Sequence, residues 1–387
     1  MTAALTLLRN AEVYAPAHLG RRDLLVGGGT VLAMAPGLPL PALPGCEVVE
    51  LEGARLLPGL VDPHLHLTGG GGEAGPGSRM PPVELRALAG AGITTAVGVL
   101  GTDGTTRSVA SLVAATLGLR ARGLSAWCWT GSYQVPPPTL TGSVRSDLAF
   151  VDPILGVGEV ALSDHRSSQP TLDELLRLAA DCHVGGLMSG KAGVLHLHLG
   201  DGPRGLELVR QALDRTELPP RVFYPTHVNR RRALFEEALG LARRGCPVDL
   251  TAFPVEDGED AWSAPDALER YLASGAPAHL VTVSSDGGGC LPTYDAQGQL
   301  LAMDAGRPGA LLDALRTLLA RGRPLAQVLP AFTTNAALAL RLHRKGRVEV
   351  GADADLVVLD AADQVREVMA RGRFLVRAGV LQPEASP

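Results

Sequence analysis

Short apolar segments alternate with amphipathic segments along most of the chain, and this alternation constrains the fold more than any other feature. The eight strand-like segments span residues 56–67, 93–102, 124–133, 154–164, 192–201, 221–229, 247–253 and 279–287. Helical periodicity occupies residues 83–92, 111–123, 172–182, 205–215, 233–245 and 266–275 between them. Eight parallel strands in continuous alternation with helices close into a barrel more readily than they stay an open sheet. The sequence therefore predicts an α/β fold with a (β/α)8 TIM barrel.

The two ends of the chain have a different pattern. Residues 1–56 and 344–387 contain short β-like runs that are broken by Gly and Pro. Neither end is long enough to cover its own sheet, so we expect one small β-sandwich domain built from both termini. The predicted barrel domain is then residues 57–343.

Composition excludes several classes of function. The formal net charge is −5, with 46% hydrophobic and 19% charged residues, so no basic surface for nucleic acid or for an anionic membrane is predicted. The N-terminal segment lacks a signal-peptide pattern, and no apolar run is long enough to span a bilayer. Five scattered cysteines without CxxC spacing indicate reduced thiols. These features predict a cytoplasmic protein that acts on a small molecule or peptide.

Metal-binding side chains recur where the predicted strands end. His64 and His66 are two residues apart on one strand, so their side chains project from the same face. Four further donors stand near the ends of other strands: Glu159, His198, His227 and Asp286. TIM-barrel active sites gather at the carboxyl ends of the strands, and imidazoles and carboxylates are suitable ligands for Zn²⁺ and similar ions. The pattern predicts a metal centre at the mouth of the barrel.

Longer motifs around these donors resemble the amidohydrolase superfamily and, within it, isoaspartyl dipeptidases. They are GLVDPHLHLTGGGGEAGP, VGVLGTDG, TGSYQVP, SDHRS, HLGD, PTHVNR, SSDGGG and the tail GRVEVGADADLVVLD. The resemblance implies a centre with two divalent metal ions, zinc being the expected metal. By the same resemblance His64 and His66 bind one ion, His198 and His227 bind the other, and Asp286 ligates the first ion and serves as proton shuttle.

Glu159 departs from the family pattern, in which a carboxylated lysine bridges the two ions. The only lysines are Lys191, near the opposite end of its strand, and Lys345, in the tail. We expect Glu159 to supply the bridging carboxylate itself, with no carboxylated lysine. Its carboxyl carbon would lie roughly 3–4 Å closer to the backbone than that of a carbamate. Gly156 and Gly158 permit a bulge that brings the strand closer to the metals. The alternative is that Glu159 only forms a salt bridge and a single ion binds.

The resemblance also implies roles for residues around the centre. Tyr133 matches the residue that donates a hydrogen bond to the developing oxyanion. The implied substrate-binding residues are Glu73 and Thr102 at the substrate ammonium group, Arg166 and Arg230 at its carboxylates, and Cys290, where the family usually has serine. His196 shares a strand face with His198 one layer deeper, so it is expected to lie inside the barrel or behind a ligand.

The sequence thus predicts hydrolysis of the β-linked amide of isoaspartyl dipeptides by a metal-bridged hydroxide, with Asp286 as proton shuttle. Two other functions remain open on the same scaffold. One is hydrolysis of a cyclic amide or an N-acyl amino acid, as in dihydroorotase-like or deacylase-like relatives. The other is a catalytically silent scaffold. A homo-oligomer is expected from the resemblance.

Overall fold

Strands from both ends of the chain form one sheet in the computed structural model, which describes residues 5–41, 45–294 and 300–383. Its N-terminal strands are β1 (Leu5–Tyr14), β2 (His18–Gly27), β3 (Thr30–Ala35), β4 (Cys46–Glu50) and β5 (Arg55–Pro58). Its C-terminal strands are β16 (Leu356–Leu359), β17 (Val365–Ala370), β18 (Arg373–Arg377) and β19 (Val380–Leu381). The order is β19-β18-β17-β16-β5-β1-β2-β3, with β4 beside β1. The antiparallel pair β5 and β16 joins the two ends.

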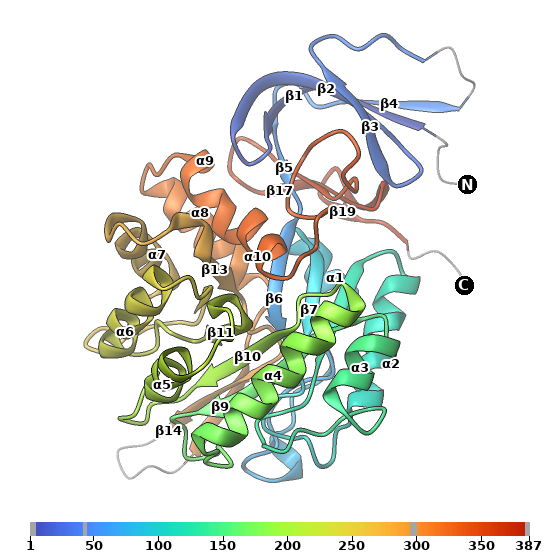
Figure 1. Ribbon diagram of the computed structural model, residues 1–387. Coiled ribbons are helices and arrows are strands. Elements are labelled where there is room, and N and C mark those ends of the chain that lie inside the picture. Colours follow the sequence, from blue (N-terminus) through green and yellow to red (C-terminus); the bar gives the residue numbers. More distant parts are fainter. Residues whose placement is uncertain (1–4, 42–44, 295–299, 384–387) are drawn as a thin grey trace.

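This terminal sheet curls over a core of its own. Leu24 and Val26 of β2 belong to the same buried cluster as Met369 of β17, although three strands separate β2 from β17 in the sheet. The turn at Gly29 touches the turn at Gly372, so the distant strands meet face to face. The sheet lies at one end of the molecule (Figure 1). The division of the chain at residues 57 and 343 stays a prediction about folding units.

The eight predicted barrel strands are all present. They are β6 (Leu60–Leu65), β7 (Ile93–Gly98), β8 (Ser125–Thr130), β9 (Ile154–Leu162), β10 (Val194–Leu199), β11 (Phe223–Thr226), β12 (Val248–Thr251) and β13 (Val281–Ser284). Strands β6 to β11 pair in parallel in chain order, and β12 pairs with β13. All residues of these strands except Trp127 are buried, because helices cover the outer face and side chains fill the interior. The TIM-barrel prediction is confirmed.

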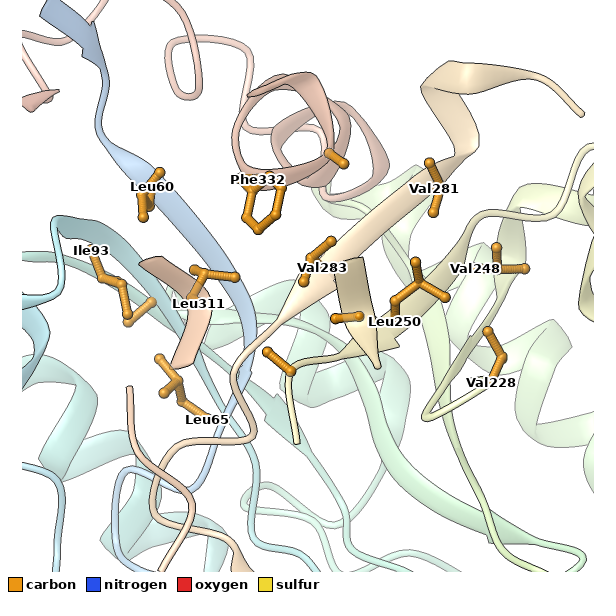
Figure 2. Packing of buried hydrophobic residues seen from close by; sticks show 14 of the residues in the cluster. Leu60, Leu65, Ile93, Val228, Val248, Leu250, Val281, Val283, Leu311 and Phe332 are labelled. Atoms are coloured by element: carbon orange, nitrogen blue, oxygen red, sulfur yellow. The ribbon is translucent and has the colours of Figure 1, made fainter. Parts of the chain in front are cut away.

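The last strands complete the ring. Leu65, at the end of β6, bridges in parallel to Gly287, just after β13, and Val228 N–H donates to the Asp249 carbonyl oxygen at 3.3 Å. A short 3-10 turn, η4 (Leu329–Phe332), packs against both β6 and β13. Figure 2 shows Phe332 and Leu311 among the buried side chains of the first and last strands. Few hydrogen bonds join the last strands to their neighbours, so apolar packing closes the barrel there.

Helices follow the strands and surround the barrel. They are α1 (Leu85–Gly90), α2 (Val109–Ala121), α3 (Val144–Phe150), α4 (Leu172–Ser189), α5 (Glu207–Arg215), α6 (Arg232–Arg243), α7 (Ala264–Ala273), α8 (Ala310–Ala320), α9 (Leu325–Val328) and α10 (Thr334–Ala339). Each segment predicted to be helical overlaps one of them. None of the helices in the described ranges has the length and apolarity needed to cross a membrane. A hairpin of β14 (Cys290–Tyr294) and β15 (Leu300–Ala305), which the sequence pattern did not predict, follows β13.

Candidate metal centre and substrate pocket

The structure brings the predicted metal donors together at the carboxyl ends of the barrel strands. The donor atoms form three groups, each within 4.8 Å: His64, His66 and Glu159; His64, His227 and Asp286; Glu159, His198 and His227. All are buried apart from Asp286, which is partly exposed. These donors are spread over positions 64 to 286. They meet here because all the strands run in the same direction, so their last side chains lie at the same end of the barrel.

Glu159 lies at the middle of this arrangement. Its Oε2 atom is 3.1 Å from His198 Nδ1 and 3.5 Å from His64 Nε2, whereas its Oε1 atom is 3.5 Å from His66 Nε2. The carboxylate therefore faces donors of both halves of the predicted centre.

A bulge in β9 explains how so short a side chain reaches the centre. Between Leu195 and Leu197 of β10 the pairing moves from Val157 to Val160, so β9 contains one extra residue beside Glu159. A Cβ atom at Gly158 would lie 2.7 Å from the Cβ of His196, so only glycine allows this close approach. The predicted bulge is confirmed.

Unpaired polar atoms show that the donor set fits a metal ion. His64 Nε2, Glu159 Oε1 and Asp286 Oδ1 are buried and have no hydrogen-bond partner in the described part of the chain. A buried polar atom without a partner costs free energy, and the cost is larger for a charged group. A divalent cation between these atoms would remove that cost, and imidazole and carboxylate donors suit such an ion.

The ionisation of Glu159 and His227 suits metal binding. Burial by itself raises the pKa of Glu159, but His64, His198 and His227 outweigh it, and the pKa lies well below its usual value. Burial lowers the pKa of His227 to about 3, which keeps this imidazole neutral. Metal binding requires deprotonated ligands, so an ionised carboxylate and a neutral imidazole are ready to coordinate.

Three histidines have a partner on the ring nitrogen that faces away from the centre. His227 Nδ1 lies 2.7 Å from Thr251 Oγ1, and His64 Nδ1 lies 2.8 Å from Nε2 of His196. His198 Nε2 lies 3.0 Å from Asp164 Oδ2, which leaves Nδ1 of His198 facing Glu159. Such partners orient metal-binding histidines and select their tautomers.

Asp164 is a functional residue that the sequence reasoning missed. Its carboxylate accepts hydrogen bonds from Nε and Nη2 of Arg166 at 3.0 and 2.8 Å, and it also contacts His198. Burial tends to raise the pKa of Asp164, but His198 and Arg166 together lower it, so the carboxylate stays an acceptor. The sequence could have indicated this residue, because it stands two residues before Arg166 in the motif SDHRS at the end of a strand.

Tyr133 reaches the centre from the loop after β8. Its hydroxyl oxygen is 2.8 Å from Nδ1 of His198 and its ring is 4.3 Å from that imidazole, measured between centroids. Burial, reinforced by the charge of Glu159, raises the pKa of the phenol well above its usual value. The hydroxyl group is therefore protonated and able to donate a hydrogen bond beside the centre.

A cavity of about 800 Å³ opens over the metal donors, and all the predicted substrate-binding residues line it. They are Glu73, Thr102, Arg166, Arg230 and Cys290. Glu73 Oε1 lies 3.3 Å from Arg166 Nη1 and 3.6 Å from Cys290 Sγ. The Thr102 hydroxyl group is buried and has no partner among the described residues.

Arg230 lies apart from the Glu73 and Arg166 pair. It forms an ion pair with Asp201 at 3.0 Å and donates to the Leu199 carbonyl oxygen at 2.8 Å. The cavity wall thus contains two separate arginine–carboxylate pairs, Arg166 with Glu73 and Arg230 with Asp201.

Arg107 holds the loop that carries Glu73, and no motif in the sequence pointed to this residue. Its guanidinium group donates to the carbonyl oxygens of Gly70 and Gly71 at 2.8 and 3.0 Å, and it is buried. Because these bonds fix the glycine-rich loop against the loop after β7, the Glu73 side chain is placed over the centre.

Neither lysine lies among the metal donors. Lys191 Nζ donates to the Val151 carbonyl oxygen at 2.7 Å, before the start of β9. Lys345 is buried between Asp353 and Asp355, and its ammonium group also contacts Ser125 at the start of β8. Both amines are therefore at the amino ends of the strands, on the side of the barrel away from Glu159.

Comparisons with known proteins agree with this geometry. Residues 55–375 match the model of the Amidohydrolase family. The beta-aspartyl dipeptidase of Fervidobacterium islandicum AW-1, solved in complex with a beta-Asp-Leu dipeptide, is 41% identical, with 99% of each chain covered and a TM-score of 0.94. The N-isopropylammelide isopropylaminohydrolase of Burkholderia multivorans shares the fold, with 20% identity over 99% of this chain and 100% of that chain and a TM-score of 0.67.

Curated relatives are more distant. An adenine deaminase of Klebsiella pneumoniae subsp. pneumoniae is 26% identical over 362 residues, which cover 88% of this chain and 51% of that protein. The chain spans about half the length of the curated relatives it matches. The family match, the likeness to the dipeptidase and the buried donor set agree with one another. The chain therefore belongs to the amidohydrolase family of metal-dependent hydrolases and, within it, is similar to β-aspartyl dipeptidases.

Proposed function

We propose that this protein hydrolyses the β-linked amide bond of isoaspartyl dipeptides with two divalent metal ions, zinc being the expected metal. The observation that carries the proposal is the contact between Glu73 and Arg166 in the cavity above the metal donors. In an isoaspartyl residue the α-ammonium and the α-carboxylate groups are both free and are attached to one carbon. A carboxylate and a guanidinium group 3.3 Å apart can pair with both at once. The likeness to a dipeptidase that binds beta-Asp-Leu supports this substrate class.

Each nearby residue then has a role that its position allows. Bound divalent ions would supply Lewis acidity and lower the pKa of coordinated water toward neutrality. Asp286, beside His64 and His66, would accept a proton from the attacking water and pass it to the leaving nitrogen. Tyr133 would donate its hydrogen bond to the oxyanion that develops on the amide oxygen. Arg230 would pair with the carboxylate of the leaving amino acid.

Glu159 would bridge the two ions in this proposal, because its carboxylate contacts donors of both halves of the donor set. The position of both lysines at the amino ends of the strands supports a centre without a carboxylated lysine. The cytoplasmic location and the homo-oligomeric state of the enzyme stay predictions from the sequence.

A substrate panel combined with metal analysis tests the proposal. We expect hydrolysis of β-Asp-Leu and about two zinc ions per chain, with the α-Asp-Leu isomer at least about 100-fold poorer because its carboxylate and ammonium groups cannot pair with Glu73 and Arg166 together. Dihydroorotate, N-acetyl amino acids and adenine complete the panel. Turnover of one of these in place of β-Asp-Leu would assign the cavity to a different substrate.

Exchange of Glu73 for Gln tests the ammonium site. We expect kcat/KM for β-Asp-Leu to fall about 30- to 100-fold, because removing one partner of a partly buried charge pair costs about 2–3 kcal/mol. A β-Asp-Leu analogue with an acetylated amine has no ammonium group, so Glu73→Gln should not reduce its slower turnover. Glu84→Gln, at an exposed position next to α1, is the matched control. An equal loss of kcat/KM for both substrates would show that Glu73 does not bind the ammonium group.

A further inference from the structure

His196 is a buried histidine to which the proposed reaction gives no role. It lies on β10 two residues before His198 and is completely buried. Its Nε2 atom is 2.8 Å from Nδ1 of His64, and its Nδ1 atom is 3.0 Å from the carbonyl oxygen of Tyr224. A carbonyl oxygen, two nitrogens of one imidazole and one nitrogen of a second therefore form a continuous chain that ends at the metal donors.

The direction of these hydrogen bonds follows from the carbonyl group. A carbonyl oxygen only accepts, so Nδ1 of His196 must carry a hydrogen. A neutral imidazole carries a single hydrogen, which leaves Nε2 of His196 as an acceptor. His64 must then carry a hydrogen on Nδ1, and in its neutral form, the one that binds metal, this is its only ring hydrogen, so that Nε2 has a free lone pair. That Nε2 atom is the buried, unpartnered nitrogen that lies 3.3 Å from Asp286 Oδ1.

The surroundings prevent His196 from turning away from this chain. Its ring stacks on the indole of Trp129 at 4.9 Å between centroids and 14° between planes. The Nε1–H group of Trp129 donates to the carbonyl oxygen of Pro63, the residue before His64. The same buried indole therefore stacks on the His196 ring and is bonded to the backbone just before His64.

We propose that His196 is a positioning residue that holds His64 in the one tautomer whose Nε2 can bind a metal ion. In the opposite arrangement His64 Nδ1 would accept a hydrogen bond, and Nε2 would carry a hydrogen that blocks coordination. The inference depends on the proposed metal centre, but it is independent of which substrate the enzyme hydrolyses.

Two substitutions at His196 separate hydrogen bonding from packing. His196→Leu removes the acceptor, whereas His196→Gln places an amide oxygen near the position of Nε2, where it can accept from His64. We expect His196→Leu to weaken binding of Zn²⁺ about 10- to 100-fold in chelator competition, the range for loss of a group that orients a metal ligand. His196→Gln should recover most of this affinity. His183→Gln, a half-buried position on α4, is the control.

Equal losses in the Leu and Gln variants, or unchanged affinity in the Leu variant, would overturn the proposal. The unmodified zinc-loaded protein gives a second test that needs no variant. Nitrogen-15 NMR of labelled histidine should show His64 protonated at Nδ1 and metal-bound at Nε2, and the reverse would contradict the proposal. Zinc affinity is measured without substrate, so failure of the dipeptide panel and failure of this inference are distinguishable.

Discussion

Replacement of Asp286 by Asn is expected to reduce kcat for β-Asp-Leu about 10³-fold while most of the bound metal remains. An amide can still place an oxygen near a metal ion, but it cannot accept a proton from water and return it to the leaving nitrogen. Loss of general acid–base catalysis costs about 10²–10⁴-fold in rate. Steady-state kinetics and metal analysis of the same preparation give both quantities.

The state of Asp286 in the structure supports this expectation. Burial by itself raises the pKa of its carboxyl group, but His64 and His66 hold the pKa below its usual value, so the group starts the reaction ionised. Asp214→Asn, at an exposed ion pair with Arg244, is the matched control. A nearly normal kcat in Asp286→Asn would assign proton transfer to another group.

The second large effect concerns Glu159. We expect metal-free protein to regain full activity with zinc alone, and added bicarbonate to change neither the rate nor the extent of recovery. A carbamate forms on a lysine amine with carbon dioxide, whereas Glu159 is already an ionised carboxylate. Recovery of β-Asp-Leu hydrolysis with and without bicarbonate measures this directly. A clear requirement for bicarbonate would contradict the role of Glu159.

Variants of Glu159 extend this test. Glu159→Gln should reduce activity at least about 100-fold, because it removes the negative charge with which the buried carboxylate would bind the metal ions. Glu159→Lys should not be rescued by bicarbonate, since a carbamate arm is roughly 3–4 Å longer and all residues of β9 are buried. Full activity of Glu159→Lys in bicarbonate would show that the bulge of β9 leaves room for the longer group.

Much of the fold was predictable because it depends on local pattern. Apolar runs with helical segments between them specify strands and helices, and eight such repeats specify a barrel. The bulge near Glu159 could be inferred from Gly156 and Gly158, because glycine tolerates close backbone approach. The hairpin β14 and β15 was not predicted, since its pattern does not belong to the repeat.

The site was predictable in part for the same reason. His64, His66, Glu159, His198, His227 and Asp286 stand at strand ends, and the geometry of a barrel makes strand ends converge. Asp164 was missed although it stands in the motif SDHRS at the end of a strand, and Arg107 was missed because an arginine in a loop has no distinctive local pattern.

The sequence by itself determined the strands, the barrel and the set of donor side chains, because these depend on periodicity and on residue type at strand ends. Only the tertiary structure decided which atoms meet. The contact of Arg166 with Glu73 and that of His196 with His64 join residues 93 and 132 positions apart in the chain. Such contacts are set by the register of neighbouring strands and by loop conformation. The contacts between these side chains decide which nitrogen of His64 is free and which charged groups face the substrate.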